Sequence, residues 1–146
     1  MTTTTALFAL GVLIVGSVVI GLVMKAREGH ARQVSSHAGE DPDTVGATQW
    51  GEHATLLQFS TEFCTRCPGV SRTLAAIADR EPGVVHIDVD LTHRADLAKH
   101  FQILQTPTTL ILDSDGVVRT RLGGTVARAS VERELQQVAG AQHVYI

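Results

Sequence analysis

The chain has 146 residues, 44% of them hydrophobic, and its 12 Lys and Arg against 15 Asp and Glu give a formal net charge of −3. The basic residues form no stripe with interleaved aromatic side chains, so the pattern of a nucleic-acid-binding protein is absent. No internal repeat is present, and the length suits a single globular domain with a modest core.

Residues 6–24 form an apolar run of 19 residues without a charged side chain. A helix of that length spans about 28 Å, close to the hydrocarbon thickness of a bilayer. We therefore expect residues 1–29 to form an N-terminal transmembrane anchor with its flanks. A cleaved signal peptide is the alternative. It fits less well, because no Lys or Arg precedes the run and no small-x-small cleavage site precedes the next charges.

Three basic residues follow the apolar run, Lys25, Arg27 and Arg32, whereas residues 1–24 contain none. Positively charged flanks are enriched on the cytoplasmic side of membrane proteins. This asymmetry predicts a single-pass protein of the cell membrane whose C-terminal part lies in the cytoplasm. The presence of only two cysteines is compatible with either side of the membrane.

Residues 30–48 are polar and show no apolar periodicity, and they include Ser35-Ser36 and Asp41-Pro42-Asp43. This composition is typical of a flexible linker, which would let a domain search on the order of 25 Å from the membrane. We therefore expect three parts: an anchor at 1–29, a linker at 30–48 and a globular domain at 49–146.

The two cysteines stand together as Cys64-Thr65-Arg66-Cys67, directly after a β-prone run at 54–59 and before helical spacing at 69–80. At such a strand-to-helix junction, free N–H groups and the helix dipole stabilise a thiolate on Cys64. Cys67 follows one turn later, within reach to close a disulfide, which predicts a dithiol redox centre. A zinc site and a pair of buried structural thiols are the alternatives. Zinc would need two ligands from seven histidines whose closest spacing is seven residues, and we expect no metal.

We expect further strands and helices downstream of the cysteines. Thr92 is expected to cap the helix that begins there, and Gly123-Gly124 precedes the last helix. In order they are a strand at 84–89, a helix at 92–101, a strand at 108–112, a turn at 113–116, a strand at 117–122 and a helix at 127–139. The motifs in this series are Phe63-Cys64-Thr65-Arg66-Cys67, Val84-Val85-His86-Ile87-Asp88-Val89-Asp90, Thr106-Pro107-Thr108 and Gly123.

This combination, in this order, resembles the thioredoxin family over about residues 50–140, and more narrowly the small membrane-tethered thioredoxin-like proteins of bacteria. The resemblance implies an α/β thioredoxin-like fold, a central mixed sheet flanked by helices, here with an N-terminal transmembrane helix. It implies that Cys64 is the attacking thiol and Cys67 the resolving one.

The resemblance also assigns a substrate groove. Pro107 matches the family's cis-proline, which leaves the Thr106 backbone to pair with a substrate, whereas alone it would read as an ordinary strand-start proline. Phe63 would form an apolar rim of the groove. Arg66 is expected to favour the Cys64 thiolate, which predicts a reduction potential above the roughly −270 mV of thioredoxin.

The sequence departs from the family at Gln58, which stands where thioredoxins carry a buried aspartate that assists proton transfer at the resolving cysteine. Gln cannot titrate, so that relay is missing or is supplied by water or another group. His86 could be buried, exposed, or a proton carrier in place of the aspartate. Ser60 and Thr65-Arg66 also replace the family's usual residues, an aromatic and Gly-Pro.

These observations predict a membrane-anchored thiol–disulfide oxidoreductase that exchanges disulfides with protein substrates and requires no separate cofactor. Its electrons would come from a thiol reductant such as a thioredoxin reductase system, or from a membrane electron donor. Two alternatives stay open. One is an exported envelope thiol reductase for haem-protein or disulfide maturation, and the other is a thioredoxin-fold binding or assembly module with little turnover.

Overall fold

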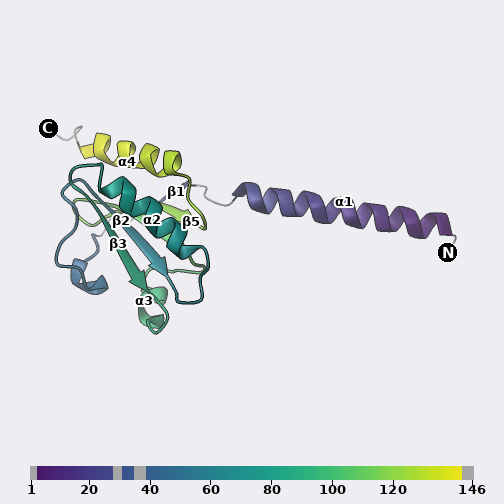
Figure 1. The fold of residues 1–146 in the computed structure, drawn as a ribbon, viewed down its shortest axis with the longest axis horizontal. Coiled ribbons are helices and arrows are strands. Elements are labelled where there is room, and N and C mark those ends of the chain that lie inside the picture. Colours follow the sequence, from purple (N-terminus) through teal and green to yellow (C-terminus); the bar gives the residue numbers. More distant parts are fainter. Residues whose placement is uncertain (1–2, 28–30, 35–38, 143–146) are drawn as a thin grey trace.

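A computed structural model describes residues 3–27, 31–34 and 39–142 (Figure 1). Its elements run in the order α1 (Thr3–Arg27), β1 (Ala31–Gln33), the 3-10 helix η1 (Pro42–Val45), β2 (Ala54–Ser60), α2 (Cys67–Ala78), β3 (Val84–Asp90), α3 (Ala95–His100), β4 (Thr108–Asp113), β5 (Val118–Gly123) and α4 (Arg128–Gln142). The predicted strands and helices of the C-terminal domain are all present, and their ends differ from the expected positions by a few residues.

The five strands form one mixed sheet in the order β1-β5-β4-β2-β3. β2 and β3 are parallel, and the other neighbouring pairs are antiparallel. The central strands β2 and β4 are buried along almost their whole length, which explains their near-continuous apolar sequence. The expected thioredoxin-like arrangement of a mixed sheet flanked by helices is confirmed.

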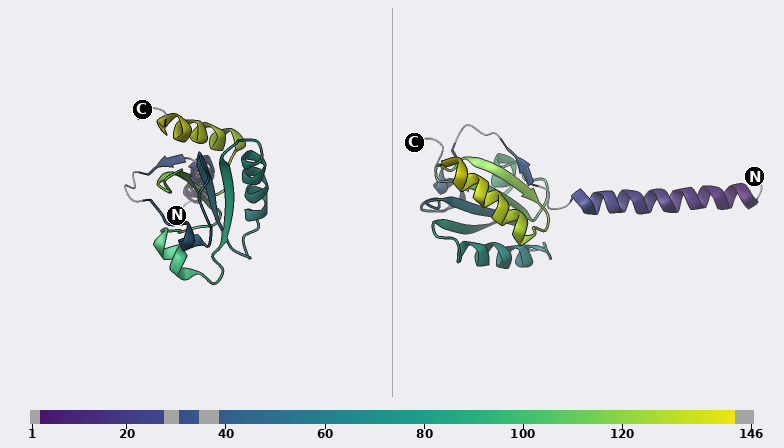
Figure 2. Two further views of the ribbon diagram at one scale, coloured as in Figure 1. Left: turned by 90° about the vertical axis from the view of Figure 1, so that its left-hand side faces the viewer. Right: turned by 90° about the horizontal axis from the view of Figure 1, so that it is seen from above.

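Helices cover both faces of the sheet (Figure 2). On one face, α2 and α4 share a core with β2, β4 and β5, built from Ala54, Leu56, Val70, Leu74, Ile77, Ile111, Leu122, Val131, Leu135 and Val138. On the other face, α3 packs Leu97 and Phe101 against a second cluster that includes Phe59 and Leu110. The alternating inward side chains of β2 therefore supply both cores, and this fixes the strand's register.

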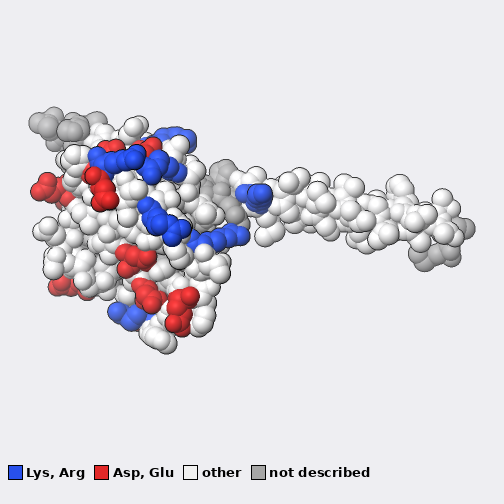
Figure 3. Space-filling model, in the orientation of Figure 1, with Lys and Arg blue, Asp and Glu red and all other residues white. Residues whose placement is uncertain are grey.

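α1 extends away from the domain, and its apolar side chains are exposed (Figure 1). The stretch Thr3–Ala26 is long and apolar enough to cross a membrane, and none of it is buried in the protein. In Figure 3 the surface of α1 stays uncharged until the end nearest the domain, where blue atoms begin. Because residues 6–24 contain no charged side chain, no side of α1 over that stretch presents a charged face to water.

The described part of segment 30–48 differs from the expected flexible linker. Ala31, Arg32 and Gln33 form β1, which pairs with β5 as the outer strand of the sheet, and Val34 packs against the core below α3. The three residues of β1 are exposed, so their stabilisation comes from main-chain pairing and leaves no apolar pattern in the sequence. Residues 35–38 lie outside the described part of the chain.

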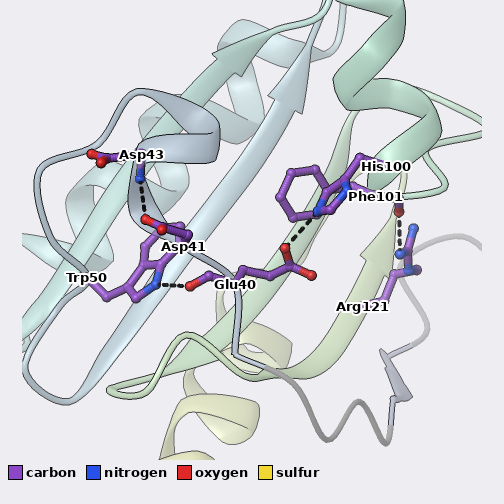
Figure 4. A network of polar contacts seen from close by, with 7 residues as sticks. All are labelled: Glu40, Asp41, Asp43, Trp50, His100, Phe101 and Arg121. Carbon is purple, nitrogen blue, oxygen red and sulfur yellow. Dashed lines mark hydrogen bonds and ion pairs between the residues drawn. The ribbon is translucent and has the colours of Figure 1, made fainter.

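The segment before β2 is also fixed to the domain (Figure 4). The indole Nε1 of Trp50 donates to the carbonyl of Glu40 at 2.8 Å, and the Glu40 carboxylate lies 2.8 Å from Nε2 of His100 on α3. The Glu40 N–H donates to the carbonyl of Gly116 in the β4–β5 turn. Trp50 is thus a packing residue, and it anchors a segment that composition alone assigns to a loop.

The expected helix at 92–101 is shorter, because α3 begins only at Ala95. Thr92 does not cap it. Its hydroxyl donates to the Asp90 carboxylate and accepts from the N–H of Glu62, so Thr92 ties the turn after β3 to the loop before the cysteines. The hydroxyl oxygen of Thr92 thus accepts from Glu62 and not from an N–H at the start of α3, whose N-cap residue is Arg94.

Candidate active site

The two cysteines lie where β2 ends and α2 begins. Cys64 and Cys67 form a disulfide with an S–S distance of 2.03 Å and a Cα–Cα distance of 5.5 Å. Cys67 is the first residue of α2 and is buried, whereas Cys64 precedes the helix and is partly exposed. Cys64 is therefore the more accessible of the two cysteines, and both lie at the strand-to-helix junction that the sequence indicates.

A second loop lies beside the disulfide. The Thr106–Pro107 peptide bond is cis, as the resemblance implied, and β4 starts directly after it. The register that pairs Phe59 with Thr108 brings this loop next to the end of β2. Thr61 Oγ1 and Thr106 Oγ1 are 3.5 Å apart, a contact between the two loops that sequence reasoning did not anticipate.

The expected rim residue, Phe63, and the expected thiolate-stabilising cation, Arg66, are both exposed. The Phe63 side chain is 82% exposed, which is unusual for a large aromatic side chain and fits a surface that contacts a partner. Arg66, also exposed, is the N-cap residue of α2 and makes no side-chain capping hydrogen bond. Both lie within two residues of Cys64 in the sequence, and their roles as groove rim and as thiolate-stabilising cation stay predictions.

Gln58 lies beneath the resolving cysteine. It is fully buried, and its Nε2 donates to the carbonyl of Cys67 at 3.1 Å. Its Oε1 lies 3.3 Å from Nε2 of His86 on the neighbouring strand β3. The site thus holds a buried amide where a carboxylate was expected from the family, and an imidazole is hydrogen-bonded behind it.

Among the described contacts, His86 is the titratable side chain that lies within hydrogen-bonding distance of Gln58, and Gln58 in turn contacts Cys67. Desolvation by burial lowers the pKa of His86, and the negative charge of Asp88 opposes that shift. Asp88 itself accepts a hydrogen bond from Ser60 at 2.6 Å. Of the three options that the sequence left for His86, the structure supports partial burial next to Gln58.

Metal ligation finds no support among the described residues, where no group of three or more His, Cys, Asp or Glu side chains could hold an ion. The arrangement is instead suited to two-electron exchange between the Cys64–Cys67 disulfide and an external thiol pair.

Comparison with known proteins agrees with this chemistry. The Thioredoxin family model matches residues 46–137. The thioredoxin of Mycolicibacterium smegmatis is 31% identical over 96 residues, which cover 64% of this chain and 81% of that protein. Thioredoxin H5 of Oryza sativa subsp. japonica is 25% identical over 69 residues, and that match spans 47% of this chain and about half, 51%, of the rice protein.

Among solved structures, chloroplastic thioredoxin z superposes with a TM-score of 0.56 at 17% sequence identity, covering 75% of this chain and 99% of that one. At this level of identity the likeness concerns the fold.

Proposed function

The chain belongs to the thioredoxin family and is a thiol–disulfide oxidoreductase, and we propose that it acts on protein substrates while anchored in a membrane by α1. The observation that carries the proposal is the Cys64–Cys67 disulfide at the start of α2, beside the Thr106–Pro107 loop. We assign the anchor to residues 1–29 and the thioredoxin-like domain to residues 49–146, with the intervening segment partly bound to the domain.

In the reduced enzyme the Cys64 thiolate attacks one sulfur of a substrate disulfide, and the other substrate sulfur leaves as a thiolate. Cys67 then attacks the Cys64 sulfur of the mixed disulfide and releases the second substrate thiolate. The Cys64–Cys67 disulfide forms, and the substrate gains two electrons. The exposure of Cys64 and the burial of Cys67 support this order of roles.

The surrounding residues support the first step. Arg66 and the N-terminus of α2 place positive charge near Cys64, which favours its thiolate. Phe63, Thr106 and Pro107 form the groove that receives the substrate chain, with the exposed Phe63 side chain on one side and the cis Thr106–Pro107 peptide on the other. A reduction potential above that of thioredoxin follows from a stabilised thiolate.

The enzyme works at the cell membrane as a single-pass protein with its domain in the cytoplasm. Lys25, Arg27 and Arg32, which follow the apolar span, support this orientation. Each cycle that reduces a substrate leaves the disulfide form. A thiol reductant, such as a thioredoxin reductase system, or a membrane electron donor must therefore restore the dithiol.

Trapping tests this function. A Cys67→Ser variant of the full chain, expressed in its native membrane, should accumulate mixed disulfides that a thiol reductant releases, because the resolving sulfur is gone. The Cys64→Ser, Cys67→Ser double variant is the matched control and should accumulate none. Equal adduct levels in the two variants would refute turnover through Cys64 and favour a binding module.

A further inference from the structure

The chain enters the domain from α1 at the end of the sheet that carries the cysteines. Ala31, the first residue of β1, pairs with Leu122 on β5, Leu122 pairs with Thr109 on β4, and Thr109 pairs with Gln58 on β2. These four residues form one row across the sheet. Gln58 donates to the carbonyl of Cys67, so the Gln58 end of this row lies next to the disulfide, and Ala31 is at the other end, three strands away.

The connection between α1 and this row is short. Arg27 ends α1 and Ala31 begins β1, and four Cα–Cα steps of about 3.8 Å join them, a reach of about 15 Å at most. The apolar run ends at Met24, and the three residues from there to Arg27 add about 5 Å of helix. When α1 spans a bilayer, Ala31 therefore lies within about 20 Å of the hydrocarbon boundary.

The direction of β1 orients the rest of the domain. From Ala31 the strand runs to Gln33, which pairs with Thr120, and Thr120 lies opposite Ile111. The chain thus runs from the anchor along the sheet and away from the row of Gln58, so the end of the sheet that carries the cysteines is the end nearer to the attachment of α1. In Figures 1 and 2 the N-terminal end of α2 lies on the side of the domain that faces α1.

Side chains on this edge suit a protein partner with apolar surface. Phe63 and Leu104 are 82% and 96% exposed, and among the described residues outside α1 the only other large exposed hydrophobic side chain is Val85. Leu104 also lines a groove of about 550 Å³, together with Arg32 of β1 and Thr108, which follows the cis-proline. The groove thus joins the strand next to the anchor to the loop next to the disulfide.

We propose that this site exchanges disulfides with a cysteine pair held close to the bilayer surface in an integral membrane protein. The proposal rests on the proposed function, that of a membrane-anchored oxidoreductase. Confinement to two dimensions and to one height above the bilayer raises the effective concentration of such a partner without any new contact. Cysteines far from the membrane or in soluble proteins lack that advantage.

The test uses the full chain, reduced and then co-reconstituted in liposomes with a single-span peptide that carries an oxidised cysteine pair. In one probe the pair lies about 10 Å beyond the hydrocarbon edge, and in the other a helical spacer, at about 1.5 Å per residue, places it about 50 Å away. A water-soluble peptide disulfide is the third substrate. Each reaction transfers two electrons from Cys64 and Cys67 to the probe.

We expect the near probe to be reduced at least about tenfold faster than the far probe. Inserting twenty Gly and Ser residues between Gly29 and His30 adds a root-mean-square reach of about 25 Å and should bring the ratio close to one. The same twenty residues appended after Ile146 should leave the ratio unchanged. All three proteins should reduce the soluble peptide at one rate, which shows that the insertion leaves the domain folded and active.

The proposal is wrong if the native chain reduces the near and far probes at equal rates. It is also wrong if the variant with the inserted spacer keeps the near-to-far rate ratio of the native chain. In both cases reduction of the soluble peptide would leave the proposed oxidoreductase function standing. Failure of the native chain to reduce any of the three substrates overturns that function, and the present proposal with it.

Discussion

His86 is partly buried next to the Gln58 amide, so protonation of its imidazole destabilises the folded state. Burial lowers the pKa of His86, with Asp88 opposing the shift, so the unfolded chain binds this proton at a higher pH than the folded one. The contribution of neutral His86 to the free energy of unfolding is therefore fully present above its unfolded pKa of about 6.5. It is lost as the pH falls from there toward the lowered pKa of the folded state.

A His86→Gln substitution should remove this loss, because Gln does not titrate and its amide can still donate to Gln58. We expect the urea midpoint of the native protein to fall more than that of the variant between about pH 7.5 and about pH 5.5. Groups elsewhere titrate equally in both proteins, so the difference isolates His86. An identical fall in both would show that its protonation does not oppose folding.

Arg66 is the basic residue nearest in sequence to the attacking cysteine. Replacing it with Gln removes a cation that favours the thiolate, so the disulfide should become harder to reduce. For an exposed pair we expect a change of about two- to fivefold in the equilibrium constant with glutathione. Arg72→Gln, an equal change of charge at another exposed position of α2, should have no measurable effect. If both variants shift alike, the effect belongs to net charge and not to the site.

At the scale of elements, the turn between β4 and β5 depends on Gly116. Its φ is +75°, and a Cβ at this position would collide with the indole Nε1 of Trp50 and the carbonyl of Glu40. Gly46 has a φ of +77° but no atom within 4 Å of a Cβ, which makes it a matched control for backbone strain alone.

We expect Gly46→Ala to cost about 1 kcal/mol of unfolding free energy and Gly116→Ala about 1–3 kcal/mol more, because the second change also displaces Trp50. Trp50 is the single tryptophan of the chain, so its fluorescence reports the displacement directly. A red-shifted emission in Gly116→Ala but not in Gly46→Ala is the predicted signature. Similar unfolding curves for both variants would show that the turn tolerates a side chain.

The same elements show which parts of the structure could be predicted from the sequence. The central strands could be predicted because their sequences are almost continuously apolar, and α2 because its apolar side chains repeat with helical spacing; the cysteines stand at the junction between these two patterns. β1 could not, because three exposed residues are held by main-chain bonds to β5. The contact of Trp50 with Glu40 and that of Gln58 with His86 join residues whose neighbours only the folded chain defines.

For the whole molecule, the side of the membrane on which the domain lies decides its redox partners. A reduced pair in the cytoplasm would act as a reductase supplied by cytosolic thiols, whereas the same pair in the envelope would need electrons from across the membrane. In the proposed arrangement, the short path from α1 to β1 keeps the site close to the bilayer in either case. The orientation of the chain in the membrane therefore changes the source of the electrons but not the distance of the disulfide from the bilayer.

A membrane-impermeant maleimide measures this orientation. From the basic residues after α1 we expect Cys64 to be labelled only after lysis, and without prior reduction, because the cytoplasm keeps the pair as a dithiol. Thr4→Cys in a Cys64→Ser, Cys67→Ser background marks the other end of α1 and should be labelled in intact cells. Labelling of Cys64 in intact cells would reverse the topology and favour an envelope enzyme. A requirement for reductant would then indicate an oxidase, and its absence a reductase, because the resting state of the pair reveals the direction in which electrons flow.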